Sequence, residues 1–150
     1  MLAYSHAQVG LMLLGPLVFG VPVWADGVLS VEVFTASEHP ITGVEDERLR
    51  ATTVMAYSVD GLERFESGLS EGLPPDPEAA KTEALRRIQQ LDDARLAPAK
   101  NAAIGLARAV QYGVDRYPAI VFNGTAVVYG VTDLVDAVER YDAWRKDKAR

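Results

Sequence analysis

Two runs of alternating or β-branched apolar residues predict strands near the start of the charged part of the chain. The first covers Val28–Thr35, and the second covers Ala51–Val59. The segment 36–50 between them contains serine, His-Pro and Thr-Gly steps and a charged cluster at 45–48. We therefore expect a loop there, with room for one helical turn.

Helical patterns fill the middle of the sequence. Asp60, with Glu63 three residues later, has the spacing of a capping box. The following helix presents an apolar stripe and is expected to end at the Gly-Leu-Pro-Pro run 72–75. The stripe comprises Leu62, Phe65 and Leu69.

A second helical stretch is predicted to open at Asp76-Pro77, an N-cap followed by proline in the first turn. Because Pro98 is unfavourable inside a helix, we expect a break near Asp92–Ala97 and a restart beyond it. The restarted helix should end at Gly113, a residue suited to a left-handed cap.

The strongest local signal is a β-hairpin near the C-terminus. Asn123-Gly124 separates Tyr117–Phe122 from Thr125–Tyr129, which predicts a two-residue type I′ turn. A last helix follows, with Thr132 predicted as N-cap and Asp133 complementing the helix dipole. The order of elements predicts one α/β domain: a central mixed sheet of about four strands, a helical insertion before the C-terminal hairpin, and a closing helix.

The first 25 residues differ from the rest because they contain no Lys, Arg, Asp or Glu. The apolar stretch 9–24 is shorter than the roughly 20 residues of a membrane-spanning helix. Val23 and Ala25 are modest and small residues at positions −3 and −1, so we expect a secretory signal peptide over 1–25, cleaved after Ala25, and a mature domain over 26–150. An uncleaved anchor or a buried N-terminal helix is the alternative. After cleavage no stable membrane span is expected.

The amino-acid composition excludes several kinds of binding and catalysis. The chain has 15 Lys and Arg against 21 Asp and Glu, a net charge of −6, so direct nucleic-acid binding is not expected. It has no cysteine, which excludes disulfides, thiol catalysis and cysteine-ligated metals. With two histidines and scattered carboxylates, neither a metal site nor a cofactor is predicted.

The run from Tyr112 to Gly130 resembles the C-terminal half of a thioredoxin-like fold. In that fold a turn leads through an X-Pro step into a hairpin, a glycine and the last helix. The resemblance gives Pro118 the position of the fold's cis-proline, and an aromatic residue before proline favours the cis form. It therefore implies a thioredoxin-like sandwich.

Three segments are more specifically similar to a family of exported proteins of integrating conjugative elements, related to pilus-assembly components of conjugative type IV secretion. The segments are VEVFTASEHPITG, GLPPDPEAA and YPAIVFNGTAVVYGVTDLVDAVERY, within residues 28–144. The resemblance implies a periplasmic protein that takes part in conjugative DNA transfer, with other proteins of the transfer apparatus as partners. It carries over no catalytic residue.

The loop that holds Cys-x-x-Cys in redox thioredoxins here reads Ala36-Ser37-Glu38-His39-Pro40, so dithiol exchange is impossible. Ser37, Glu38 and His39 are the residue types of a nucleophile, an acid and a base, but neighbours in an extended loop tend to point apart. We therefore predict no catalytic residue. A thiol-independent enzyme is an alternative, as is a stand-alone exported peptide-binding or chaperone-like module.

Our hypothesis is a non-catalytic scaffold that binds a partner protein through one face. The candidate partner-binding residues come from two segments, the loop after the first strand and the step before the hairpin. They are Ser37, Glu38, His39, Pro40, Arg116, Tyr117 and Pro118.

Overall fold

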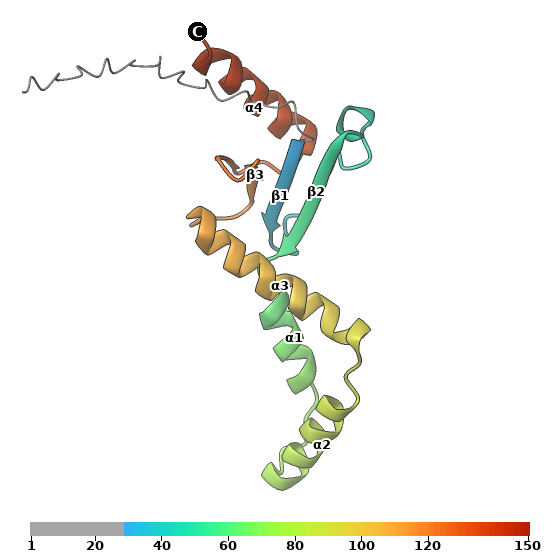
Figure 1. Ribbon diagram of the computed structural model, residues 1–150. Coiled ribbons are helices and arrows are strands. Elements are labelled where there is room, and N and C mark those ends of the chain that lie inside the picture. Colours follow the sequence, from blue (N-terminus) through green and yellow to red (C-terminus); the bar gives the residue numbers. More distant parts are fainter. Residues whose placement is uncertain (1–28) are drawn as a thin grey trace, which may run out of the picture.

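The computed structural model describes residues 29–150, and the predicted signal peptide lies outside them (Figure 1). The elements run in the order β1 (Leu29–Thr35), the 3-10 turn η1 (Glu47–Leu49), β2 (Thr52–Ser58), α1 (Gly61–Ser70), α2 (Pro77–Gln89), α3 (Asp93–Tyr112), β3 (Ala119–Phe122), β4 (Ala126–Tyr129) and α4 (Leu134–Lys148). None of the helices in this described part combines the length and the apolar character that crossing a membrane requires.

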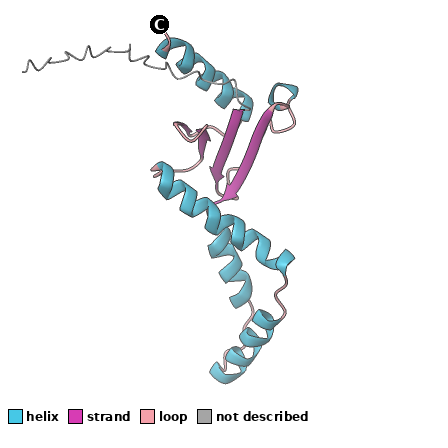
Figure 2. Ribbon diagram, in the orientation of Figure 1, coloured by secondary structure: helices cyan, strands magenta, loops and turns pink. Residues whose placement is uncertain are grey.

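The four strands form one mixed sheet in the order β2-β1-β3-β4. β1 runs parallel to β2 and antiparallel to β3, and β4 returns antiparallel to β3. Helices flank this sheet, with α4 and α3 on opposite sides of it in the view of Figure 2. The mixed α/β architecture, the C-terminal hairpin, the helical insertion and the closing helix are confirmed.

Alternation along β1 divides the core into two layers. Val31 and Val33 point to the side of α4, where Phe122 stacks on Tyr141 with ring centroids 4.5 Å apart. Phe34 points to the side of α3 and stacks on Tyr57. The two central strands are covered on both faces, so residues 31–34 of β1 and all of β3 are buried.

Close packing of α3 on the sheet depends on one glycine. A Cβ placed on Gly105 would lie 2.4 Å from the Cβ of Tyr57, far inside van der Waals contact. Only glycine therefore lets α3 approach β2 so closely.

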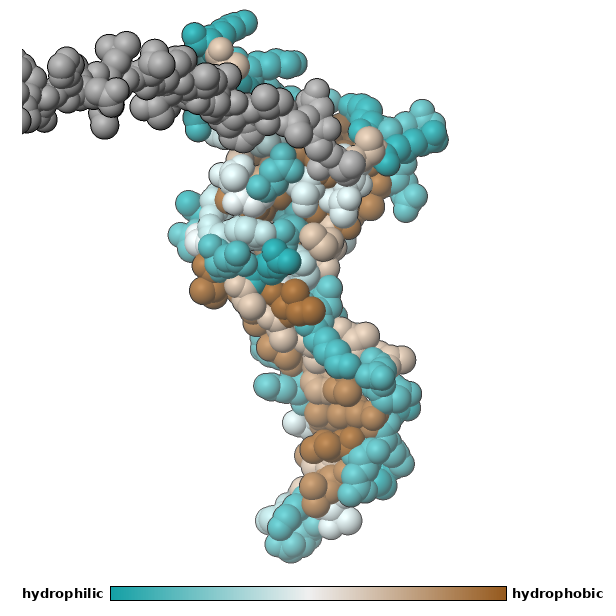
Figure 3. All heavy atoms as spheres, viewed as in Figure 1, coloured by the Kyte–Doolittle hydropathy of each residue, from teal (hydrophilic) through white to brown (hydrophobic). Residues whose placement is uncertain are grey.

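The insertion forms a helical arm, here defined as α1 and α2, that extends away from the sheet below α3 in Figure 1. α2 contains no buried residue, and Leu85 and Ile88 are 50% and 52% exposed. Apolar side chains accordingly form a continuous brown strip on this part of the surface in Figure 3.

The predicted break near Asp92–Ala97 is wrong in its extent. The chain is non-helical only around Gln90–Asp92, and Pro98 lies inside α3. Asp92 starts that helix by accepting a hydrogen bond from the Arg95 amide at 2.8 Å. Pro98 stands in the second turn, where the loss of its amide removes a single intrahelical hydrogen bond.

Asp60 occupies the predicted N-cap position of α1 without the predicted capping bond, and the predicted N-cap of α4 is wrong. The Asp60 carboxylate makes no capping bond to α1, because neighbouring hydroxyl groups occupy it. Asp133, not Thr132, caps α4, accepting hydrogen bonds from the amides of Val135 and Asp136. By contrast, the Asp76 cap and the left-handed Gly113 (φ 67°) are confirmed.

The hairpin turn has the predicted backbone but one more residue in its connection. Asn123 and Gly124 both have positive φ, 49° and 66°. Thr125 stays outside the ladder because its amide bonds back to the Phe122 carbonyl at 3.0 Å, and Phe122 pairs with Ala126 instead. The connection therefore has three residues.

Candidate partner-binding face

The sheet register brings the two predicted segments to the same end of neighbouring strands. Phe34, near the end of β1, pairs with Ala119 at the start of antiparallel β3. Residues 36–40 leave the sheet where residues 116–118 enter it. The Tyr117–Pro118 peptide bond at this point is cis, as the sequence predicted.

A hydrogen-bonded carboxylate anchors the first segment. The Ser37 hydroxyl and amide both donate to Asp60 Oδ2, at 2.5 and 3.1 Å, and the Ser58 hydroxyl donates to Asp60 Oδ1 at 2.7 Å. Arg64 Nε lies 3.2 Å from the same carboxylate. These hydrogen bonds, those from Ser37 first, hold the pKa of Asp60 far below its usual range. Ser37 thus fixes the loop to the start of α1.

The rest of the loop is a tight turn with exposed side chains. The His39 amide donates to the Ala36 carbonyl at 3.0 Å, and the Thr35 hydroxyl donates to the His39 carbonyl at 2.5 Å. Glu38 and His39 project into solvent, with 3.6 Å between Glu38 Oε1 and His39 Nδ1. Backbone bonds therefore hold the turn while these two side chains are presented outward.

The geometry does not assemble a Ser–His pair in this turn. The Ser37 hydroxyl donates to Asp60, so its proton is directed away from His39. A serine nucleophile activated by histidine needs its hydroxyl on that histidine, and no such contact joins Ser37 to His39. Within residues 29–150 there is also no group of three or more His, Asp or Glu side chains able to hold a metal ion.

The second segment supplies an exposed aromatic side chain beside a buried proline. Tyr117 is 39% exposed, whereas Pro118 is buried and its carbonyl accepts the Gly130 amide at 2.9 Å. The Arg116 guanidinium lies over the Tyr129 ring, 4.7 Å from its centroid. Tyr117 and Arg116 can touch a partner, whereas Pro118 acts by fixing the backbone.

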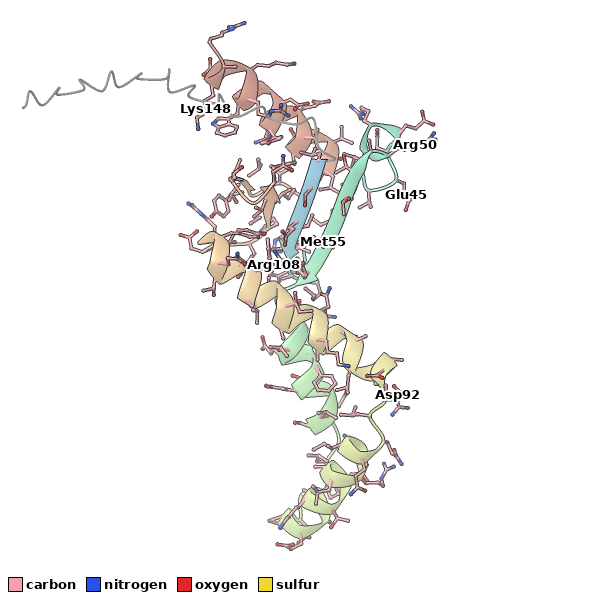
Figure 4. The ribbon with its side chains drawn as sticks, in the orientation of Figure 1. Glu45, Arg50, Met55, Asp92, Arg108 and Lys148 are labelled. Atoms are coloured by element: carbon pink, nitrogen blue, oxygen red, sulfur yellow. The ribbon has the colours of Figure 1, made fainter. Side chains whose placement is uncertain are left out.

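Sequence reasoning missed a buried polar cluster on the α3 side of the sheet. Glu32 is 5% exposed, and its Oε1 accepts the Tyr112 hydroxyl at 2.5 Å and lies 3.7 Å from an Arg108 nitrogen. Figure 4 shows Arg108 on α3 where that helix crosses the sheet. Glu32 Oε2 has no hydrogen-bond partner among the described residues. No local pattern marks this contact, because Glu32 follows the alternation of β1 and Tyr112 lies 80 residues away in the sequence.

This cluster perturbs the ionisation of Tyr112. The hydrogen bond to the Glu32 carboxylate, followed by burial, raises the pKa of Tyr112 above its usual value. The phenol therefore stays protonated and holds the carboxylate across the physiological pH range.

Together these features define a cysteine-free α/β protein with a fixed, exposed turn and an exposed tyrosine at one end of its sheet. A family model described as "Protein of unknown function (DUF1525)" matches residues 28–147, so the chain belongs to that family. Neither the curated proteins nor the solved structures contain a significant match to it.

Proposed function

We propose that this protein is a non-catalytic, thioredoxin-like subunit that takes part in conjugative DNA transfer by binding other proteins of the transfer apparatus. The observation that carries the proposal is the meeting of the 36–40 turn with the Tyr117–Pro118 step at one sheet end. In a redox protein of this type that position would hold a dithiol, and this chain has no cysteine. What remains there is a surface for recognition.

The strand order supports the thioredoxin-like part of the proposal. A parallel pair, β1 and β2, adjoins an antiparallel hairpin that begins at the cis-proline and is closed by α4. The crossover from β1 to β2 departs from the usual helical connection between parallel strands, because residues 36–51 contain only the turn η1. This leaves the predicted face less covered by helices.

The proposed role of the protein in conjugation rests on its sequence similarity to exported proteins of integrating conjugative elements. The predicted signal peptide agrees with a periplasmic location. A net charge of −6 favours protein partners over DNA as the direct contact.

The candidate face offers few but well-fixed contacts. His39, Glu38 and Tyr117 are exposed, and the backbone that carries them is tied to Asp60 and to the sheet. A backbone that is already fixed loses little conformational freedom on binding, which favours the use of its side chains as contacts.

The test is a conjugation assay with a donor that produces the double variant His39→Ala/Tyr117→Ala. We expect transfer to fall by about tenfold or more, because a few central side chains supply most of the affinity of an interface. The matched control is Glu66→Ala/Lys81→Ala, two exposed residues of the helical arm. Immunoblots establish equal periplasmic amounts of all forms.

Wild-type transfer by an equally abundant double variant would show that this face is not the docking surface. A stand-alone exported peptide-binding or chaperone-like module is the competing function. It predicts that complete deletion of the gene leaves conjugation unchanged.

A further inference from the structure

The two edges of the sheet differ in whether their main chain is already bonded. At the β2 edge, the Asn101 side chain from α3 accepts the Ser58 amide at 3.3 Å and donates to the Ala56 carbonyl at 3.0 Å. At the end of β2, a side chain thus occupies main-chain groups that another strand would bind. Covering an edge in this way is a common protection against unwanted strand pairing.

The β4 edge has no such cover among the described residues. The Gly130 amide bonds to the Pro118 carbonyl, and this fixes the alternation of the antiparallel ladder. By the β3–β4 register, Ala126 and Val128 bond inward to β3, so the amides and carbonyls of Val127 and Tyr129 face outward. The strand carries no charged residue and no proline, the usual devices against strand addition.

A groove runs alongside this open edge. It has a volume of about 290 Å³ and lies between β4 and α4, lined by Ala126, Val127, Val128, Arg140, Tyr141 and Trp144. Trp144 is 45% exposed and stacks on Tyr141, with ring centroids 6.0 Å apart. The groove therefore offers an apolar floor and an aromatic wall to the side chains of an added strand.

Cations flank the groove, although the protein as a whole has a net charge of −6. Lys148 Nζ lies 4.8 Å from the centroid of the Trp144 ring, and Arg145 lies over Tyr141. Figure 4 shows Lys148 at the C-terminal end of α4. Arg116 covers Tyr129 at the other end of β4, on the α3 side of the sheet and away from the groove. Two of the arginines already have acidic partners. Arg140 is paired with Asp136, and Arg116 lies 3.4 Å from Asp115.

We propose that the β4 edge and the adjoining groove bind an extended acidic segment of a partner protein, which adds to the sheet as a fifth strand. Outward main-chain groups supply the strand hydrogen bonds, and alternate apolar side chains of the segment enter the groove. Acidic side chains of the segment lie near Lys148 and Arg145. This surface is separate from the turn at 36–40 and goes beyond the proposed function.

Charge argues against a second copy of this chain as the occupant. Pairing two β4 strands would bring two sets of the same cations together along one junction, and like charges placed opposite each other are unfavourable. An acidic segment meets the same cations with opposite charge.

Hydrogen exchange of the full-length protein tests the proposal directly. The probe is a short synthetic peptide of alternating valine and glutamate, and a valine–lysine peptide is its control. With the acidic peptide, we expect the Val127 and Tyr129 amides to slow their exchange by about tenfold or more. The Val128 amide, already bonded to β3, should change little, and the lysine peptide should protect neither edge amide.

Two variants measure separately what the main-chain groups of the β4 edge and the cations contribute to peptide binding. Val127→Pro removes an outward donor that β3 does not use, and it should weaken binding of the acidic peptide by about fivefold. Lys148→Glu should weaken it by about threefold, with a smaller dependence on salt. Lys146→Glu is the matched control, because a residue two positions away points more than half a turn around α4.

Equal effects of Lys146→Glu and Lys148→Glu would overturn the proposal, as would equal binding of both peptides. Protection of Val127 and Tyr129 that rises with protein concentration in the absence of peptide would also overturn it. In that case the edge would be occupied by a second copy of the chain.

Discussion

The sheet and the helical arm differ in how much of their apolar surface is buried. Val31, Ile120, Phe122 and Leu134 in the sheet and α4 have no exposed surface, whereas α2 buries none of its residues. Apolar burial is the main source of folding free energy, so the sheet with its two covering helices carries most of the stability. Within the arm, α1 packs against α3, whereas α2 depends mainly on local interactions.

Those local interactions are well defined. Glu83 lies 2.6 Å from Arg86 and 2.9 Å from Arg87 on successive turns of α2. Arg87 also donates to the carbonyls of Leu69 and Glu71, at 3.0 and 2.7 Å, and so satisfies the end of α1. Surface pairs of this kind contribute little each, which makes the arm the region most easily opened.

The largest expected effect comes from one truncation in each region. Phe122→Ala removes a fully buried ring stacked on Tyr141 and should cost about 3–5 kcal/mol of unfolding free energy. Leu85→Ala in the arm should cost at most about 1 kcal/mol, because half of that side chain is already in water. Urea unfolding of both variants measures the difference, and similar losses would refute the division between the regions.

A pair of glycines sharpens the comparison. Gly105→Ala places a methyl group against Tyr57, so α3 must move, and about 1–3 kcal/mol should be lost. Gly68→Ala, in α1, meets nothing within 4 Å and should stabilise the protein by up to about 1 kcal/mol. Thermal unfolding gives both values. A neutral Gly105→Ala variant would mean that α3 does not rest tightly on β2.

The buried carboxylate gives a third test, with a pH dependence. Tyr112→Phe leaves Glu32 without its hydrogen bond and should cost about 1–3 kcal/mol near neutral pH. Because the pKa of Tyr112 is raised in the folded protein, its contribution is complete below the unfolded pKa near 10 and is lost as pH rises through the folded pKa. Between pH 8 and 11, the free energy of unfolding should therefore fall less steeply for Tyr112→Phe than for the wild type.

The sequence was informative where a local pattern decides the structure. The alternation in β1, the Asp76-Pro77 helix start and the positive φ angles of Asn123 and Gly124 all depend on near neighbours, and each prediction is confirmed. The resemblance to thioredoxin-like folds implied one face for segments 36–40 and 116–118, and the β1–β3 register brings both segments to the same end of the sheet.

The sequence predicted poorly those residues whose hydrogen-bond partners lie on other elements of the fold. Asp60 reads as an N-cap, but hydroxyl groups from the β1 turn and from β2 compete for its carboxylate. Glu32 reads as an ordinary strand residue until α3 brings Tyr112 against it. The Ser37–Asp60 and Tyr112–Glu32 contacts join residues 23 and 80 positions apart in sequence, so no local pattern reveals them.

The smallest expected effect is an acid-induced loosening confined to the arm. Hydrogen bonds from Arg86 and then Arg87 lower the pKa of Glu83 to about 2. A lowered pKa means that the stabilisation is present above the unfolded value of 4.5 and is lost as pH falls through about 2. Amides of α2 should therefore lose exchange protection in that range while those of β1 and β3 keep theirs, and high salt should weaken the effect.

Glu83→Gln provides the control for this titration. It should reproduce the loosened arm at neutral pH, with no further change in α2 on acidification to about pH 2. Because Glu83 pairs only with arginines of its own helix, the sheet amides of the variant should match those of the wild type. If the arm and the sheet lose protection together, the two regions unfold as one unit, and the contrast in burial between them does not translate into separate stabilities.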